Sequence, residues 1–510
     1  MTTAAVRPGD DRPGAPEHVD VLIVGAGLSG IGAARHVQAG LPWASFAVLE
    51  ARDAIGGTWD LFRYPGIRSD SDMFTLGYAF RPWDGERSIA DGGSILDYIR
   101  ATAAETGVDR HVRFGHRVVR AAWSTAEARW HVTAERAATG DTVELTCGFL
   151  FSCTGYYRYD RGYLPDFPGM DRFRGTIVHP QHWPDDLDVA GRRVVVIGSG
   201  ATAVTLVPAL AGTAAHVTML QRSPTWIMSL PGRSPVADAL RRALPPRLAG
   251  PAVRWALALA TLAFFELSRH RPATVKRLLL GAARRRLPAG YDVDTHFTPR
   301  YDPWDQRLCI VPDGDLFAAV RGGSASVVTD HVETFTDEGL RLRSGRVLPA
   351  DVVVTATGLD LLFLGGIELS VDGEPVDPAR RLTYKGMMLQ GVPNLAFAIG
   401  YTNASWTLKC ELTCDFVVRL LRHLHERGLR QCTPTEGHGA AGSDPLFGLS
   451  SGYVQRALDR FPRQGAADPW RVHQNYLRDW RLIRRQGVED DALVCSNPAP
   501  APALAPAGQA

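Results

Sequence analysis

Two stretches of the chain repeat one pattern, in which an apolar run meets a glycine and is followed by apolar positions at helical spacing. In the first copy, residues 19–24 are largely apolar, residues 28–38 carry the helical spacing, and residues 46–50 form the next predicted strand, which is apolar over 46–49 and ends in Glu50. Apolar runs without alternation are typical of strands buried on both faces. A strand, helix and strand in this order predict a right-handed parallel crossover.

The second copy repeats this order 173 residues further along, counted between the two glycine turns. Residues 193–197 form its first apolar run, a helix is expected from residue 201, and residues 216–220 form the next strand. The two copies predict an α/β fold with two doubly wound, Rossmann-like dinucleotide-binding domains.

The segments between and after these copies differ from them in composition and in the spacing of apolar residues. Residues 234–288 are rich in Ala, Leu and Arg at helical spacing and predict a helical insertion, whereas residues 327–357 predict strands. Residues 412–426 form a strongly amphipathic helix, which we expect to pack against the first domain. The expected division is a disordered tail (1–18), a first dinucleotide-binding domain (19–157 and 373–495), a second dinucleotide-binding domain (158–225 and 311–372), a helical insertion (226–310) and a second disordered tail (496–510).

Composition narrows the class of protein. The 510 residues carry a net charge of +2, which gives no strong electrostatic attraction to nucleic acid, so no nucleic-acid partner is expected. The seven cysteines are few and scattered, which favours the reducing cytoplasm, and no metal site is predicted. Cys410 and Cys414 could share a helix face as a redox pair, but buried thiols are the better interpretation. The oligomeric state is not predicted.

The longest apolar stretch, residues 255–267, follows Arg254 and precedes Arg269 and Arg271. Its 13 residues are fewer than the ~20 that span a bilayer. A buried helix is the simpler interpretation, and a basic amphipathic helix in peripheral contact with a membrane is the alternative.

The first glycine turn has the spacing Gly-x-Gly-x-x-Gly. Gly25 allows a tight turn, Gly27 lets a pyrophosphate approach the backbone, and Gly30 lets helix and strand pack closely. Glu50 ends the next strand, where its carboxylate can accept hydrogen bonds from ribose hydroxyls and would repel a 2′-phosphate. This site therefore suits FAD or NAD rather than NADP.

The second turn, residues 198–203, has the variant Gly-x-Gly-x-x-Ala in the same context. Arg222 stands near the place that the first site gives to Glu50, and a guanidinium there can pair with a 2′-phosphate. The residue expected beside the ribose is acidic in the first site (Glu50) and basic in the second (Arg222). This difference predicts FAD in the first site and NADPH in the second.

Between the turns, the segment 173–184 carries Phe173, Gly175, His179, Trp183 and Pro184. These residues match the Phe-x-Gly-x-x-x-His-x-x-x-Trp-Pro fingerprint, so the chain resembles the type I Baeyer–Villiger monooxygenases. Further stretches (57–72, 303–309 and 400–408) are most similar to the ethionamide-activating branch of that family.

The resemblance implies an enzyme in which NADPH reduces FAD and O₂ gives a C4a-peroxyflavin. That peroxide converts a ketone to an ester or lactone, and related enzymes also oxidise sulfides and thioamides. Arg307 matches the active-site arginine, whose charge would stabilise anionic oxygen, and Asp70 matches the acid that orients it. Positions matching flavin contacts are Ser29, Glu50, Thr58, Trp59, Asp60, Leu61, Asp70 and Val118. Positions matching coenzyme contacts are Arg68, Ser69, Asp70, Ile197, Gly198, Ser199, Gly200, Ala201, Thr202, Ala203, Gln221 and Arg222.

Two points stay open. His179 could help to reorient the domains after hydride transfer, or it could be a structural histidine. Many relatives carry Lys where this chain has Gln306, so NADPH preference depends mainly on Arg222 and Ser223.

Three other functions are compatible with parts of the pattern. A heteroatom-oxidising flavin monooxygenase shares the two nucleotide turns, but it usually lacks the Trp-Pro ending of the fingerprint. A pyridine-nucleotide disulfide reductase needs a cysteine pair beside the flavin, and no cysteine follows Glu50 until Cys147. A non-catalytic FAD/NAD(P)-binding protein would leave Arg307 and Asp70 without a use.

Overall fold

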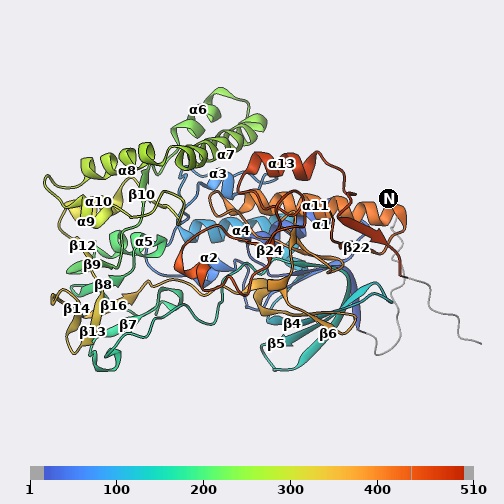
Figure 1. Ribbon diagram of the computed structural model, residues 1–510, viewed down its shortest axis with the longest axis horizontal. Coiled ribbons are helices and arrows are strands. Elements are labelled where there is room, and N and C mark those ends of the chain that lie inside the picture. Colours follow the sequence, from blue (N-terminus) through green and yellow to red (C-terminus); the bar gives the residue numbers. More distant parts are fainter. Residues whose placement is uncertain (1–15, 438, 499–510) are drawn as a thin grey trace, which may run out of the picture.

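The computed structural model describes residues 16–437 and 439–498. Two sheets, the first mixed and the second parallel, stand side by side along the long axis of the molecule (Figure 1). The parallel part of the first sheet consists of β3 (Val112–Arg113), β2 (Phe46–Leu49), β1 (Glu17–Val24), β6 (Thr142–Ser152) and β21 (Leu395–Phe397), in that order.

The two faces of the first sheet are covered differently. Val21 and Ile23 of β1 face a helical layer made of α1 (Leu28–Gly40), α4 (Gly92–Thr106) and α11 (Trp406–Arg427). Leu22 and Val24 point the other way, toward an antiparallel layer of β4 (His116–Ser124), β5 (Arg129–Arg136) and the first half of β6. Because successive side chains of β1 point to opposite faces of the sheet, the strand contributes to two separate cores. These cores bury both faces of β1.

The second sheet is parallel throughout. Its strands are β12 (Ala325–Thr329), β9 (His216–Gln221), β8 (Arg193–Ile197), β16 (Val352–Thr355) and β7 (Thr176–Val178), in that order. Helices α5 (Ala201–Leu210) and α10 (Asp315–Arg321) pack against one face. A small antiparallel sheet of β13 (Val332–Thr336), β14 (Gly339–Leu342) and β15 (Val347–Pro349) covers the other.

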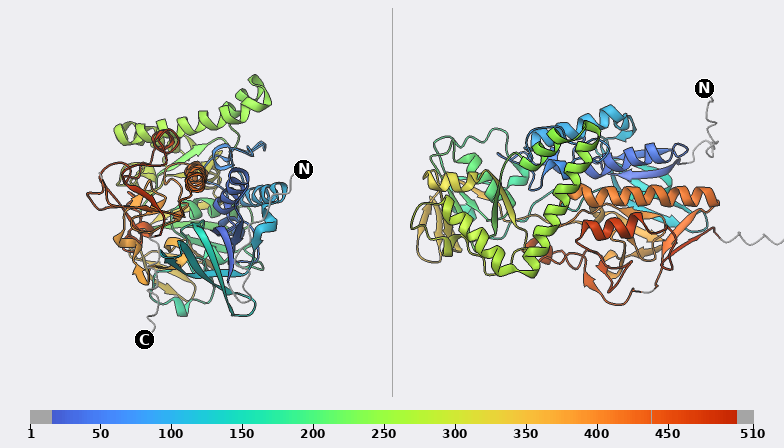
Figure 2. Two further views of the ribbon diagram at one scale, coloured as in Figure 1. Left: turned by 90° about the vertical axis from the view of Figure 1, so that its right-hand side faces the viewer. Right: turned by 90° about the horizontal axis from the view of Figure 1, so that it is seen from above.

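A helical insertion follows β9. It comprises α6 (Pro235–Ala243), α7 (Pro246–His270), α8 (Pro272–Arg286) and α9 (Val293–Phe297). Strands β10 (Ile227–Leu230) and β11 (Cys309–Pro312) pair in parallel at its two ends and close it into one unit. Seen from above, α7 crosses the junction between the two sheets (Figure 2, right).

The predicted fold class and its repeated strand, helix and strand units are confirmed, with β8 covering the predicted residues 193–197. One boundary needs correction. Strand β17 (Glu368–Val371) lies in the range expected for the second domain, but it pairs with β4 of the first sheet. Strand β18 (Glu374–Val376) forms a hairpin with β17 and adds a further strand to the same sheet. The hairpin covers an edge of the first sheet that would otherwise be exposed.

Both expected tails include residues that belong to strands. Glu17 and His18 already belong to β1, and β25 (Leu493–Ser496) reaches Ser496. The rest of the prediction for the tails concerns residues 1–15 and 499–510, which lie outside the described residues. The amphipathic helix predicted from residue 412 is α11, which begins six residues earlier and packs on α1 of the first domain as expected.

Candidate active site

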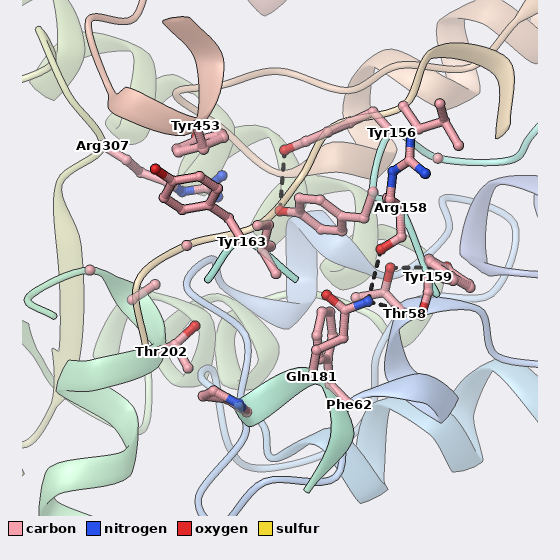
Figure 3. A pocket seen from close by; sticks show the side chains of 18 of the residues that line it. Thr58, Phe62, Tyr156, Arg158, Tyr159, Tyr163, Gln181, Thr202, Arg307 and Tyr453 are labelled. Atoms are coloured by element: carbon pink, nitrogen blue, oxygen red, sulfur yellow. Dashed lines mark hydrogen bonds between the residues drawn. The ribbon is translucent and has the colours of Figure 1, made fainter. Parts of the chain in front are cut away.

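A cavity of about 1400 Å³ lies between the two sheets, and both glycine turns open into it. The turns follow β1 and β8, so the cavity lies at the carboxyl ends of the parallel strands, where ligands bind in open α/β sheets. Figure 3 shows one wall of this cavity, with Arg307 and Tyr453 toward one end and Thr58 and Tyr159 toward the other.

The first turn leaves no room for side chains. Gly25 has a φ of +103°, and a Cβ on it would lie 2.6 Å from the carbonyl oxygen of Cys153. A Cβ on Gly30 would lie 1.7 Å from the carbonyl oxygen of Gly25, whereas Gly27 lines the cavity and packs on Gly57. The backbone is therefore free to approach a ligand only on its cavity side.

The same turn suits a dinucleotide without a 2′-phosphate. Gly27 caps α1 without a side-chain acceptor, so the first N–H groups of the helix are available to a pyrophosphate. Glu50 is 5% exposed, lines the cavity, and accepts a hydrogen bond of 2.6 Å from the N–H of Ala26. A second carboxylate lone pair can take a ribose hydroxyl, whereas a phosphate would meet an unfavourable charge.

The predicted flavin contacts after Glu50 divide into two groups. Thr58, Trp59 and Val118 line the cavity. Asp60 and Leu61 do not line it, and Asp60 is 2% exposed because its carboxylate forms ion pairs with three arginines (Arg52, Arg63 and Arg100). A carboxylate so engaged holds the loop in shape, and we assign Asp60 a structural role.

The second turn has a similar plan. Gly198 has a φ of +140°, and a Cβ on it would lie 2.3 Å from the carbonyl oxygen of Ala356, whereas a Cβ on Gly200 would meet nothing within 4 Å. Gly200 caps α5 without a side-chain acceptor, so these N–H groups also face the cavity. Ala203 is fully buried and lies off the cavity, and Ile197, Ser199, Ala201 and Thr202 line it with Gly198 and Gly200.

The two residues that end β9 have different environments. Gln221 is 2% exposed, and its amide donates to the carbonyl of His296 at 2.7 Å and to the hydroxyl of Thr329 at 2.9 Å. Gln221 does not line the cavity, and its contact with the coenzyme stays a prediction. Arg222 is exposed and lines the cavity, as does Ser223, and no ion-pair partner of Arg222 is found among the described residues. A free guanidinium beside the second turn suits a 2′-phosphate.

The predicted catalytic pair is formed. A guanidinium nitrogen of Arg307 lies 2.7 Å from a carboxylate oxygen of Asp70, and both side chains line the cavity and are less than a third exposed. Burial opposes the charge of Arg307, but the Asp70 carboxylate and the neighbouring Tyr156, Tyr453 and Tyr157 together outweigh it, so the pKa of Arg307 lies above its ordinary range. The cation is therefore permanent and is aimed into the cavity.

Arg68 and Ser69 directly precede Asp70 in the sequence and line the same cavity. Arg68 forms a two-point ion pair with Asp315 at the start of α10, which ties the loop of the first domain to a helix of the second. Ser69 is 3% exposed and donates to the carbonyl of Ser71 at 2.7 Å. Contact with the coenzyme at these two positions stays a prediction.

The fingerprint histidine has a local structural role. His179 Nδ1 accepts the N–H of Gln181 at 3.2 Å, which caps the 3₁₀ turn Pro180–His182, and burial lowers the pKa of the ring. The Gln181 amide then donates to the carbonyls of Arg158 and Tyr159 at 2.8 and 2.9 Å (Figure 3). Trp183 does not line the cavity and packs on the core of the second sheet. The fingerprint segment thus connects the core of the second sheet, through Trp183, to the chain at residues 158–159, which leads into the second domain.

Several cavity residues were not among the predicted site residues. They are the aromatic residues Tyr156, Tyr157, Tyr159, Tyr163, Trp406 and Tyr453, together with Gln181 and Arg456. Gln181 and Trp406 lie in the family-like stretches 173–184 and 400–408, and the dense run of tyrosines over residues 156–163 directly follows a buried strand. Trp406 donates its indole N–H to Ser29 at 2.8 Å, which places α11 against the first glycine turn.

Comparison with protein families gives two matches. Residues 23–82 match the NAD(P)-binding Rossmann-like domain, and residues 88–234 match a family described as flavin-binding monooxygenase-like.

Curated relatives are similar over nearly the whole chain. The FAD-containing monooxygenase EthA of Mycobacterium tuberculosis is 54% identical over 486 residues, which cover 95% of this chain and 99% of the relative. The putative FAD-containing monooxygenase MymA of the same organism is 52% identical, with coverage of 94% and 97%. The probable FAD-binding monooxygenase AlmA of Acinetobacter baylyi is 47% identical, with coverage of 94% and 96%.

Solved structures share the fold at lower identity. An oxidised steroid monooxygenase bound to NADP has a TM-score of 0.74 at 22% identity, covering 94% of this chain and 100% of that one. The monooxygenase OTEMO in complex with FAD and NADP has a TM-score of 0.69 at 24% identity, with coverage of 83% and 87%. An open structure of cyclohexanone monooxygenase has a TM-score of 0.67 at 19% identity, with coverage of 82% and 90%.

Proposed function

Because this chain belongs to the family of FAD-containing flavin monooxygenases, we propose that it is an NADPH-dependent Baeyer–Villiger monooxygenase converting ketones to esters or lactones with O₂. Membership of the family confirms the resemblance, the monooxygenase class and the flavin cofactor that the sequence predicts. The coenzyme, the ketone and the residue roles below are proposals.

The observation that carries the proposal is the position of the pair formed by Arg307 and Asp70. It lies in one cavity with both nucleotide turns, so a reacting centre between two dinucleotides can reach a fixed cation. The bound, reduced flavin supplies electrons and activated oxygen. Insertion of oxygen beside a ketone places negative charge on the former carbonyl oxygen, and a preorganised guanidinium stabilises such charge.

Asp70 holds that guanidinium in place. At 2.7 Å the carboxylate forms an ion pair with the guanidinium, which restricts the rotamers of Arg307. The phenols of Tyr156 and Tyr157 lie nearby with hydroxyls 3.4 Å apart. Burial raises the pKa of Tyr157 to about 12, so this hydroxyl stays protonated at neutral pH and can donate a hydrogen bond.

The second turn is proposed to hold NADPH. Arg222 would pair with the 2′-phosphate, and the N–H groups at the start of α5 would bind the pyrophosphate. Because the Gln221 amide donates to His296 and Thr329, Arg222 and Ser223 are the residues proposed to recognise the 2′-phosphate.

The cysteines do not support disulfide chemistry. Cys153 and Cys309 line the cavity and are both free and buried, and burial raises the pKa of Cys309 to about 12. Cys410 and Cys414 of α11 are also free and buried, with the pKa of Cys410 raised to about 12. Protonated thiols are poor nucleophiles, so a reductase mechanism has no activated cysteine here. Free thiols also fit the proposed cytoplasmic location.

The test is a panel of cyclic, aliphatic and aryl ketones with one sulfide, assayed by product mass and NADPH consumption. Ester or lactone that forms in step with NADPH supports the proposal. Sulfoxide as the sole product would identify a heteroatom-oxidising enzyme instead, and NADPH oxidation that yields only hydrogen peroxide from every compound would refute both.

A further inference from the structure

The helical insertion presents an apolar surface that the described residues do not cover. By length and composition α7 is able to cross a membrane, yet only 22% of its most apolar 18-residue window is buried. A core helix of this composition would be mostly buried. The insertion runs along the upper edge of the molecule, with α6, α7 and α8 outermost (Figures 1 and 2).

The exposed apolar side chains are concentrated on these helices. Of the eleven exposed large hydrophobic residues in the described chain, five belong to α6–α8, with exposures from 42% to 60%: Val236, Leu248, Leu259, Leu267 and Leu278. The three on α7 are spaced so that they fall within about 100° of the helix circumference. The buried residues Val253, Arg254, Ala258 and Ser268 occupy the rest of the circumference, which faces the protein, and buried Ala249 lies at the margin of the exposed arc near the start of the helix. We call the solvent side of α6–α8 the outer face.

The charge of the insertion is opposite to that of the rest of the chain. Residues 235–286 contain eleven Lys and Arg against two Asp and Glu, a net charge of +9, whereas the whole chain carries +2 and the remainder therefore −7. Arg247 adjoins exposed Leu248, and Arg277 adjoins exposed Leu278. Arg247, Arg271, Arg277 and Arg285 are exposed, and no ion pair of theirs is found in residues 16–437 and 439–498.

We propose that the outer face docks on an anionic lipid surface, with the leucines in the interfacial region and the arginines at the headgroups. Exposed leucines beside unpaired arginines match a surface that is apolar inside and negative outside. A second copy of the chain fits less well, because two faces with this positive charge repel each other in a symmetric dimer.

Docking there would place the lipid next to the cavity. The inner side of α7 contacts the cavity wall through Ala258, which packs on Tyr401 and Leu408, and Tyr401 lines the cavity. Further along, Arg269 forms an ion pair of 2.7 Å with Asp305, two residues before Arg307. If the proposed function holds, the ketones that reach this site most readily are lipophilic ones dissolved in a bilayer.

The experiment is co-sedimentation of the holoenzyme with vesicles of phosphatidylcholine alone or mixed with phosphatidylglycerol, at low and high salt. It needs no turnover, so its outcome is independent of the proposed reaction. We expect salt-sensitive binding to the anionic vesicles only. The double variant Arg247→Gln/Arg277→Gln should weaken binding by about 25-fold, roughly fivefold for each cation removed near an anionic surface.

Leucine variants separate insertion from simple charge attraction. Leu259→Glu/Leu267→Glu should abolish binding, whereas the matched control Val347→Glu/Val494→Glu should retain most of it, because these valines are similarly exposed but lie on other elements. Flavin content and thermal unfolding show that each variant is folded. Equal sedimentation with both vesicle types, binding that the leucine variant retains, or a dimer that this variant dissociates would each overturn the proposal.

Discussion

Replacing Arg307 with Ala should separate oxygen insertion from flavin reduction. The guanidinium lies 2.7 Å from Asp70 in the cavity, so its removal deletes the fixed cation and leaves a carboxylate beside the reacting oxygen. Loss of one donor to a developing oxyanion costs about 10²–10³ in rate, or about 2.7–4 kcal/mol.

The unpaired carboxylate adds a second penalty. At an effective dielectric constant near 20, two unit charges ~5 Å apart interact by about 3 kcal/mol. We take about half of this because Arg307 and Asp70 are 29% and 28% exposed and water screens them. The single variant should therefore lose about 10³–10⁴ in the rate of ester formation, and Arg307→Ala/Asp70→Asn should recover about tenfold of that loss.

The assay divides the reaction into its halves. Anaerobic stopped-flow absorbance follows flavin reduction by NADPH, which should change little, and product mass follows ester formation. Arg456→Ala is the matched control, because Arg456 lines the same cavity but stacks 3.4 Å over the ring of Tyr163 and does not form an ion pair with Asp70. Reduction that fails together with ester formation, or a double variant slower than the single one, would show that Arg307 has a different role.

Three further predictions follow from the turns and the fingerprint. Arg222→Ala should raise KM for NADPH by the equivalent of about 1–3 kcal/mol with little effect on NADH, and an unchanged ratio of kcat/KM for the two coenzymes would contradict this. Gly30→Ala should lower the free energy of unfolding by at least 1–3 kcal/mol in thermal or denaturant melts, because its Cβ would overlap a carbonyl. Gly200→Ala is its control, since a Cβ there meets nothing within 4 Å and should affect coenzyme binding alone. The folded-state pKa of His179 is below 6.5, so the native state binds fewer protons and loses stability as pH falls below 6.5. His179→Asn should remove this part of the pH dependence, and a stability difference between variant and wild type that is constant with pH would disprove it.

The parts of the fold that sequence alone predicted are those decided over short stretches. A buried strand, a glycine turn and a helix follow from neighbouring residues, so β1 with α1 and β8 with α5 were placed within a few residues. The return of β17 to the first sheet could not be predicted, because pairing with β4 depends on which sheet edge needs covering.

The site shows the same limit. Asp70 and Arg307 were paired through a resemblance, whereas Tyr156 and Tyr453 reach the cavity from two distant segments with no motif. The environment of Asp60 was not predicted either, since its place beside cavity residues did not reveal that Arg52, Arg63 and Arg100 would form ion pairs with its carboxylate.

The contacts of Gly25 with Cys153 and of Gly198 with Ala356 have a mechanical consequence. Cys153 directly follows β6 and opens the crossing to the second sheet, and Ala356 directly follows β16 and opens the crossing back. Each nucleotide turn therefore touches the first residue of a joint between the domains. A dinucleotide bound at either turn therefore lies one backbone contact away from a joint between the two domains.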